Sequence, residues 1–283
     1  MDDPAELARQ FARTLQHLQR TFDVGYVPAA ATPVPDGFVP RAATQDQTPP
    51  PPAPAVSVPA VAVDGKEALR ASAQAWGPAT KLEYLRRKNV GDCTRCPLSR
   101  TRTNIVFGVG SAEARLMFVG EAPGADEDRQ GEPFVGRAGQ RLTQWIETLG
   151  LSRGDVYIAN VLKCRPPGNR DPRPEEVGKC SPFLQAQIRA ISPSVIVALG
   201  RHAGQLLSRR ADMTLRSMRT ARLTYDAGKS ADGTPLRIPL MVTYHPAWVL
   251  RQEGGGERGQ NPDDMVLGDL KNALAIANAA RQT

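Results

Sequence analysis

The stretch LMFVGEAPGADEDRQGEPFVGRAGQ, residues 116–140, begins with an apolar run and continues as a turn rich in glycine, proline and acidic side chains. The run Leu116–Val119 has the length and composition of a buried strand. A glycine-rich turn after a strand often binds phosphate, but this turn carries acidic side chains, among them Glu121, Asp126, Glu127 and Asp128. Because carboxylates repel an anion, the turn predicts a pocket for a neutral or cation-like group.

Three further apolar runs follow, and segments with helical periodicity separate them. The runs are Val156–Leu162, Val195–Leu199 and Leu240–Tyr244, and the helical segments are Gln140–Leu149, Pro174–Ala190 and Ala203–Leu207. Strands that alternate with helices predict an α/β protein with a parallel sheet covered on both faces. Ligands of such sheets bind at the carboxyl ends of the strands, so we expect the informative side chains there.

The N-terminal part of the chain differs in composition from the rest. Residues 1–22 predict one amphipathic helix, with apolar side chains at helical spacing between residues 7 and 22. Residues 23–65 are rich in proline and alanine and predict a disordered linker. Helical periodicity returns over residues 66–88, so we assign residues 66–283 to the folded domain. The helix within residues 4–22 is a candidate docking element for a partner protein, and a dispensable extension is the alternative.

The basic charge of the chain belongs to the folded domain. The formal net charge is +7, and residues 1–80 hold six basic and eight acidic side chains, so the remainder carries +9. A basic domain favours a polyanionic partner such as DNA or RNA. There is no apolar run of 18 residues and no apolar leader at the N-terminus, so we expect a cytoplasmic protein without a membrane span.

The chain contains four cysteines, Cys93, Cys96, Cys164 and Cys180. In a reducing compartment four thiolates suit zinc or an iron–sulfur cluster better than disulfides. A zinc ribbon would repeat the close C-x-x-C pair, whereas the second pair here is widely spaced, so the spacing favours iron–sulfur over zinc. Either metal would join the segment before the first strand to the loop after the second.

Three more side chains lie at or near predicted strand ends. Asn160 falls in the second run, where a buried amide needs partners for both its NH₂ and its carbonyl. His245 follows the fourth run, and Phe134 lies in a segment unlike a core segment. Each has an ordinary structural interpretation when taken alone. Together with Glu121 they form a carboxylate, an aromatic plate, an amide and an imidazole, which fits a pyrimidine base held by one face and its polar edge.

Three long motifs, GEAPGADEDRQGEPFVGRAGQ, NVLKCRPPGNRDPRPEEVGKC and HPAWVLR, closely resemble the iron–sulfur uracil-DNA glycosylases known as family 4. The resemblance runs from about residue 81 to the C-terminus. It implies a three-layer α/β/α sandwich around a central four-stranded parallel sheet, a [4Fe–4S] cluster, and removal of uracil from DNA, by a protein that we expect to be monomeric.

The resemblance also implies roles for individual residues. The four cysteines match the cluster ligands; Glu121, Ala122 and Pro123 match the segment that lines the uracil pocket; Phe134 matches the aromatic that stacks on uracil; Asn160 matches the amide that pairs with the base edge; and His245 matches the imidazole that faces uracil O2. A related branch bonds covalently to the sugar through a histidine near the second motif. That stretch has no histidine here, so we expect hydrolysis.

These assignments predict a mechanism and leave rival functions. The target nucleotide must flip out of the duplex, and Leu250 and Arg251 are candidates to fill the gap that it leaves. Glu121 would stabilise the sugar cation or orient the attacking water, and the other acids of the turn would shape the loop. The rivals are a DNA-damage binding protein without turnover, a glycosylase for another base, and a redox enzyme.

Overall fold

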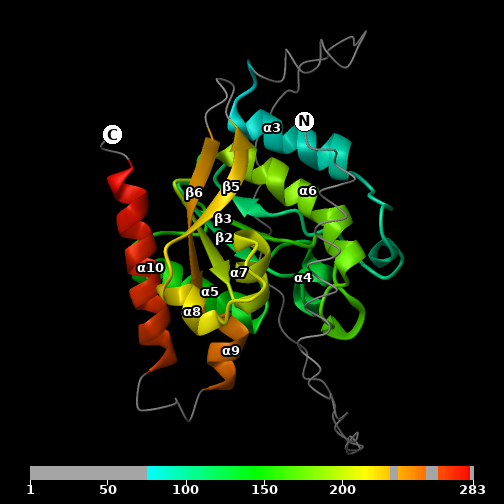
Figure 1. The fold of residues 1–283 in the computed structure, drawn as a ribbon. Helices are drawn as coiled ribbons and strands as arrows, with labels where there is room; N and C mark the ends of the chain where they lie inside the picture. Colours follow the sequence, from blue (N-terminus) through cyan, green and yellow to red (C-terminus); the bar gives the residue numbers. More distant parts are fainter. Residues whose placement is uncertain (1–74, 230–234, 253–260, 281–283) are drawn as a thin grey trace, which may run out of the picture.

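The structure, a computed structural model, describes residues 75–229, 235–252 and 261–280 (Figure 1). The predicted helix at residues 1–22 and the predicted linker at residues 23–65 lie outside these ranges, as does the first part of the helical segment predicted over residues 66–88. The rest of that segment forms the helix α3, Pro78–Tyr84, and a π-helical turn η1, Leu85–Val90.

A mixed sheet of six strands, in the order β1-β3-β2-β4-β6-β5, forms the middle layer. Its four central strands are parallel, as predicted, and they are β3 (Tyr157–Asn160), β2 (Leu116–Gly120), β4 (Val195–Leu199) and β6 (Pro235–Thr243). The edge strands β1 (Val109–Gly110) and β5 (Leu223–Lys229) pair antiparallel with their neighbours and were not predicted.

Helices cover both faces of the sheet, which confirms the three-layer architecture (Figure 1). One face packs against α3, α6 (Pro174–Ile191), α7 (Arg201–Ser208) and the short α8 (Leu215–Thr220), and the other packs against α5 (Arg137–Thr148), α9 (Pro246–Arg251) and α10 (Pro262–Ala279). Along β2, Met117 and Val119 enter the first core, while Leu116 and Phe118 enter the second. This alternation follows from the two-residue period of a strand and explains why the run is apolar at every position.

Short helices occupy the loops between these layers. They are the 3₁₀ turns η2 (Pro97–Arg100) and η3 (Pro167–Asn169) and the α-helix α4 (Ala125–Gln130), which lies within the acidic turn after β2. In the part of the chain that the structure describes, no helix is both long and apolar enough to cross a bilayer.

Candidate active site

The parallel register brings the ends of four strands to one edge of the sheet. Gly120 of β2 pairs with Asn160 of β3, and Leu199 of β4 pairs with Thr243 of β6. The residues that follow these strand ends therefore meet, although up to 124 positions separate them in the sequence, from Glu121 to His245. The edge agrees with the rule that ligands of parallel sheets bind at the carboxyl ends.

Asn160 is the last residue of β3 and lies at this edge. Its side chain is 2% exposed, and its Oδ1 has no hydrogen-bond partner among the residues that the structure describes. A buried carbonyl without a donor costs stability unless a ligand supplies the donor. The absence of a side chain at Gly120 makes room here, because a Cβ would lie 2.4 Å from Asn160 Oδ1 and 2.5 Å from Phe134 Cζ.

Phe134 is held against Asn160 by a strained loop. It has a φ of 54°, a left-handed conformation that is uncommon for residues other than glycine. The half-buried guanidinium of Arg153 donates to the carbonyls of Pro133, at 2.8 Å, and of Phe134, at 3.2 Å. Gly139 permits the close approach, since a Cβ there would lie 1.9 Å from the Phe134 carbonyl carbon. The ring is thus fixed by contacts on its own backbone.

His245 faces the same space from the end of β6, with its ring centroid 5.8 Å from that of Phe134. The Ala247 N–H donates to His245 Nδ1 at 3.1 Å, so Nδ1 is the acceptor and the ring proton resides on Nε2. Desolvation, and then the nearby Arg251, lower the pKa of His245 to about 4. His245 is therefore a neutral imidazole at physiological pH and offers one N–H donor.

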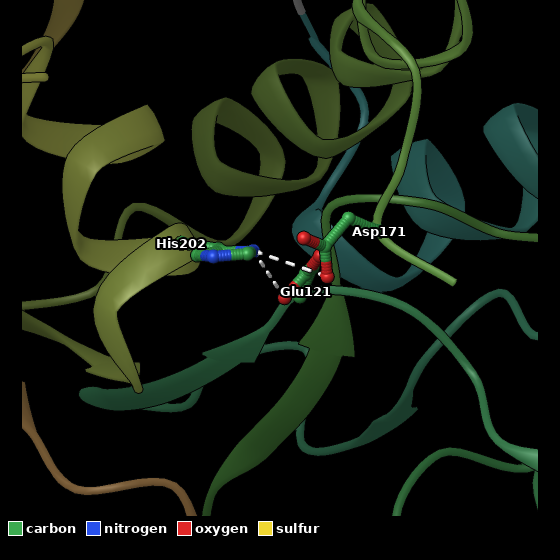
Figure 2. Close-up of side chains that lie close together, drawn as sticks. All are labelled: Glu121, Asp171 and His202. Carbon is green, nitrogen blue, oxygen red and sulfur yellow. Dashed lines mark ion pairs between the residues drawn. The ribbon is translucent and has the colours of Figure 1, made fainter. Parts of the chain in front are cut away.

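Glu121, directly after β2, meets two side chains from other loops. His202 at the start of α7 lies with Nδ1 3.0 Å from Glu121 Oε2, and Asp171 Oδ1 lies 3.9 Å from the same nitrogen (Figure 2). About a quarter of the Glu121 side chain is exposed, so this carboxylate stands at the wall of the site rather than on an open surface.

The other acids of the turn bind backbone groups, as expected for loop-shaping residues. Glu127 accepts from the N–H groups of Gly124 at 3.0 Å, Val135 at 2.9 Å and Gly136 at 3.0 Å. Asp128 is buried and accepts from the Thr103 N–H at 2.9 Å. Asp126 instead pairs with Arg129 at 2.6 Å near the surface.

The remaining predicted site residues lie around this centre. Pro123 is buried and Ala122 packs against the first core cluster, so both shape the wall after Glu121. Leu250, partly buried, and Arg251, exposed, occupy the last turn of α9. Arg251 is near enough to His245 to lower the pKa of that imidazole.

The four cysteines line a single cavity on the opposite side of β3 from Phe134, together with Arg95, Arg102, Lys163 and Lys179. The Lys163 N–H donates to Cys180 Sγ at 3.2 Å, and Arg102 Nη1 donates to Cys164 Sγ at 3.5 Å. Burial raises the pKa of Cys164, and raises that of Cys180 to about 12. Such thiols lose their protons when a metal takes the thiolates, and the cationic lining suits an anionic thiolate cluster, so the four residues fit the predicted iron–sulfur group.

A buried lysine connects this cavity to the strand-end site. Lys163 is 1% exposed, and its Nζ donates to the Asn160 carbonyl at 2.8 Å and to Gln187 Oε1 at 2.6 Å. Its backbone N–H donates to Cys180 Sγ, so a single residue contacts both β3, at Asn160, and one of the cysteines.

Sequence reasoning missed three residues of this site: Arg153, Lys163 and His202. Arg153 and Lys163 resemble surface charges in the sequence, and only burial reveals their contacts. For His202 a signal existed, because it follows the third apolar run by three positions, and that run ends at the same sheet edge.

Residues 107–271 match the profile of the uracil DNA glycosylase superfamily, a range that contains the whole strand-end site. The chain belongs to this superfamily.

Within the superfamily the similarity is to type-4 uracil-DNA glycosylases. That of Archaeoglobus fulgidus is 48% identical over 164 residues, which are 58% of this chain and 80% of the relative. That of Thermotoga maritima is 43% identical over 189 residues, 67% of this chain and 91% of the relative. That of Pyrobaculum aerophilum is 45% identical over 180 residues, which are 63% of this chain and 88% of the relative. The particular family is therefore the type-4 branch.

Proposed function

We propose that the protein is a DNA-repair enzyme that removes uracil from DNA by hydrolysis of the N-glycosidic bond and leaves an abasic site. The observation that carries this proposal is the buried Asn160 Oδ1 without a donor. Uracil presents an N3–H donor beside its O4 acceptor, and an Asn amide complements that pair. Cytosine presents an N3 acceptor and an N4 donor, which leaves the Asn160 amide mismatched on both atoms.

The other strand-end residues complete the reaction. Phe134 stacks on the flipped base. As the bond between N1 and the sugar C1′ breaks, its electron pair moves to uracil, and the His245 Nε2–H donates to the O2 on which negative charge grows. Because His245 is neutral, it stabilises this anion by hydrogen bonding without giving up its proton.

Glu121 acts on the sugar side. Its carboxylate stabilises the cationic sugar or orients the attacking water and accepts its proton, and both roles require a negative charge on the carboxylate. The water oxygen bonds to C1′, and its proton leaves through the carboxylate or the solvent. Ala122 and Pro123 line the pocket wall beside it.

We propose that Cys93, Cys96, Cys164 and Cys180 hold a [4Fe–4S] cluster. A cluster bound there would contribute its charge to the local electrostatic field and would link the loops that carry the cysteines through its bonds to the thiolates. Lys163, between this site and Asn160, keeps the Asn160 backbone in place.

DNA binding draws on the basic charge of the domain. Lys and Arg side chains grip the phosphates and offset the cost of flipping the nucleotide, a few kcal/mol. Leu250 and Arg251, on the last turn of α9 beside His245, fill the gap in the base stack. Action as a monomer, a cytoplasmic location, and recruitment of a repair or replication partner through residues 4–22 are further proposals that rest on the sequence.

The test uses an oligonucleotide with one labelled uracil, without added metal, in single- and double-stranded form. The wild type should release free uracil and leave an alkali-labile site, and His245→Ala should slow release by about 100-fold, the cost of losing one oxyanion donor. Wild-type protein that retains its cluster absorbance and binds this DNA without releasing uracil would favour a damage-binding protein instead.

A further inference from the structure

His202 contacts the carboxylate on which the proposed reaction depends. The two residues lie after the neighbouring parallel strands β2 and β4, so the sheet itself brings them together (Figure 2). Their side chains are 29% and 25% exposed, and the Nδ1–Oε2 separation is 3.0 Å. This is a partly desolvated pair at the wall of the site, unlike the exposed pairs that contribute little.

The direction of this hydrogen bond follows from the other nitrogen of the ring. His202 Nε2 lies 3.1 Å from Arg201 Nη2, and a guanidinium can only donate. Nε2 is then the acceptor, and the proton on Nδ1 points at Glu121. An imidazole whose N–H is already directed at the carboxylate is arranged as a hydrogen-bond donor rather than as a metal ligand.

We propose that His202 is a positioning residue for Glu121: as a neutral imidazole it fixes the orientation of the carboxylate, and as an imidazolium it neutralises the charge that the reaction needs. The inference rests on the proposed role of Glu121. His202 touches no substrate atom in this scheme and acts through Glu121 alone.

The groups around the ring raise the pKa of His202. The hydrogen bond to Glu121 is the largest influence and raises the pKa of His202 above 6.5, with Asp171 contributing in the same direction, while desolvation and Arg201 lower it. His245, from the end of β6, also faces His202 but remains neutral because its own pKa is near 4. Protonation places a second N–H at Nε2, so the Arg201 guanidinium must then leave its present contact with that nitrogen.

The sign of the pH effect follows. A raised pKa means that His202 gains its proton at a higher pH than an ordinary histidine does, so uracil release slows on the acid side. His245 cannot produce this limb, because it titrates at a much lower pH. Asparagine at position 202 offers an amide N–H where Nδ1 stands but does not titrate. The variant therefore distinguishes the orienting hydrogen bond to Glu121 from the effect of a positive charge at position 202.

The experiment measures single-turnover uracil release from pH 5.5 to 9 for the wild type, His202→Asn and His202→Ala, with the Kd for DNA measured in parallel. We expect His202→Ala to lose about tenfold in rate at pH 8 with an unchanged Kd. His202→Asn should stay within about threefold of the wild type at pH 8 and lose the acid limb. These magnitudes correspond to one charge-assisted hydrogen bond, about 1.4 kcal/mol per tenfold.

Two results would overturn the inference, and they differ from each other. If His202→Ala and His202→Asn both keep the rate and the pH profile of an active wild type, His202 has no role in positioning Glu121, while the proposed function stands. If the wild type itself releases no uracil, the proposed function fails and this inference fails with it. Cluster absorbance and melting temperature establish that each variant is folded.

Discussion

Among single residues, Gly120 leaves the space that two side chains of the proposed site occupy. A Cβ at this position would overlap both Asn160 Oδ1 and the edge of the Phe134 ring, so Gly120→Ala must displace both side chains. We expect kcat/KM for uracil release to fall by about 100-fold, as is typical of a shift of about 1 Å in a site. Gly268→Ala in α10 is the matched control, because a Cβ there meets nothing within 4 Å. Equal activity of the two variants would contradict this reading of the pocket.

The buried neutral His245 predicts a pH dependence of stability. Its folded pKa of about 4 lies below the unfolded value of 6.5, so between these pH values the unfolded chain binds a proton that the native protein excludes. Stability is therefore lost as the pH falls from 6.5 towards 4, by about 2 kcal/mol at pH 5. The melting temperature of the wild type should fall between pH 7 and pH 5 by roughly 4–8 °C more than that of His245→Asn. Parallel decreases in the two proteins would show that His245 titrates normally.

At the scale of elements, the loop between β2 and α5 is organised by Glu127. One carboxylate accepts three backbone N–H groups, two of them directly after Phe134. In Glu127→Gln the amide nitrogen cannot accept, so at least one of these donors loses its partner, at a cost of about 1–3 kcal/mol. We expect a lower melting temperature and slower uracil release. The control is Glu113→Gln, a change at an exposed acid outside this loop, which should leave the melting temperature and the rate of uracil release unchanged. If Glu127→Gln also left both unchanged, the loop would keep its shape without the Glu127 carboxylate.

The same scale shows what the sequence could and could not predict. The central strands were predictable because parallel strands buried on both faces are apolar at every position, as in Val195–Leu199. The edge strand β1 has only two residues, too few for any periodicity. Asn160 and His245 were selected because a buried amide in a strand needs hydrogen-bond partners and because ligands bind at the carboxyl ends of parallel strands. His202 was not selected, since its partner Glu121 lies 81 positions away and only the sheet register joins them.

For the whole molecule, the cysteine site joins segments that the sheet alone leaves apart. Cys93 and Cys96 precede η2, Cys164 follows β3, and Cys180 lies within α6. Cys180→Ser should abolish the visible absorbance and the roughly four irons of a [4Fe–4S] cluster, and should lower the melting temperature by several degrees. Ser181→Ala, one position along the same helix, should retain both. One zinc per wild-type chain, with no visible absorbance, would refute the cluster.

The central claim, that this molecule reads uracil through Asn160, is tested most directly by the selectivity of Asn160→Asp. Single-turnover base release would be measured on matched oligonucleotides that carry one uracil or one cytosine, with Gly268→Ala as the folded control. We predict that the variant loses at least about 100-fold of the wild-type rate on uracil and gains detectable release of cytosine, because a protonated Asp can donate to cytosine N3 while a carboxylate repels uracil O4. A variant that keeps the wild-type rate on uracil and still rejects cytosine would show that another group reads the base.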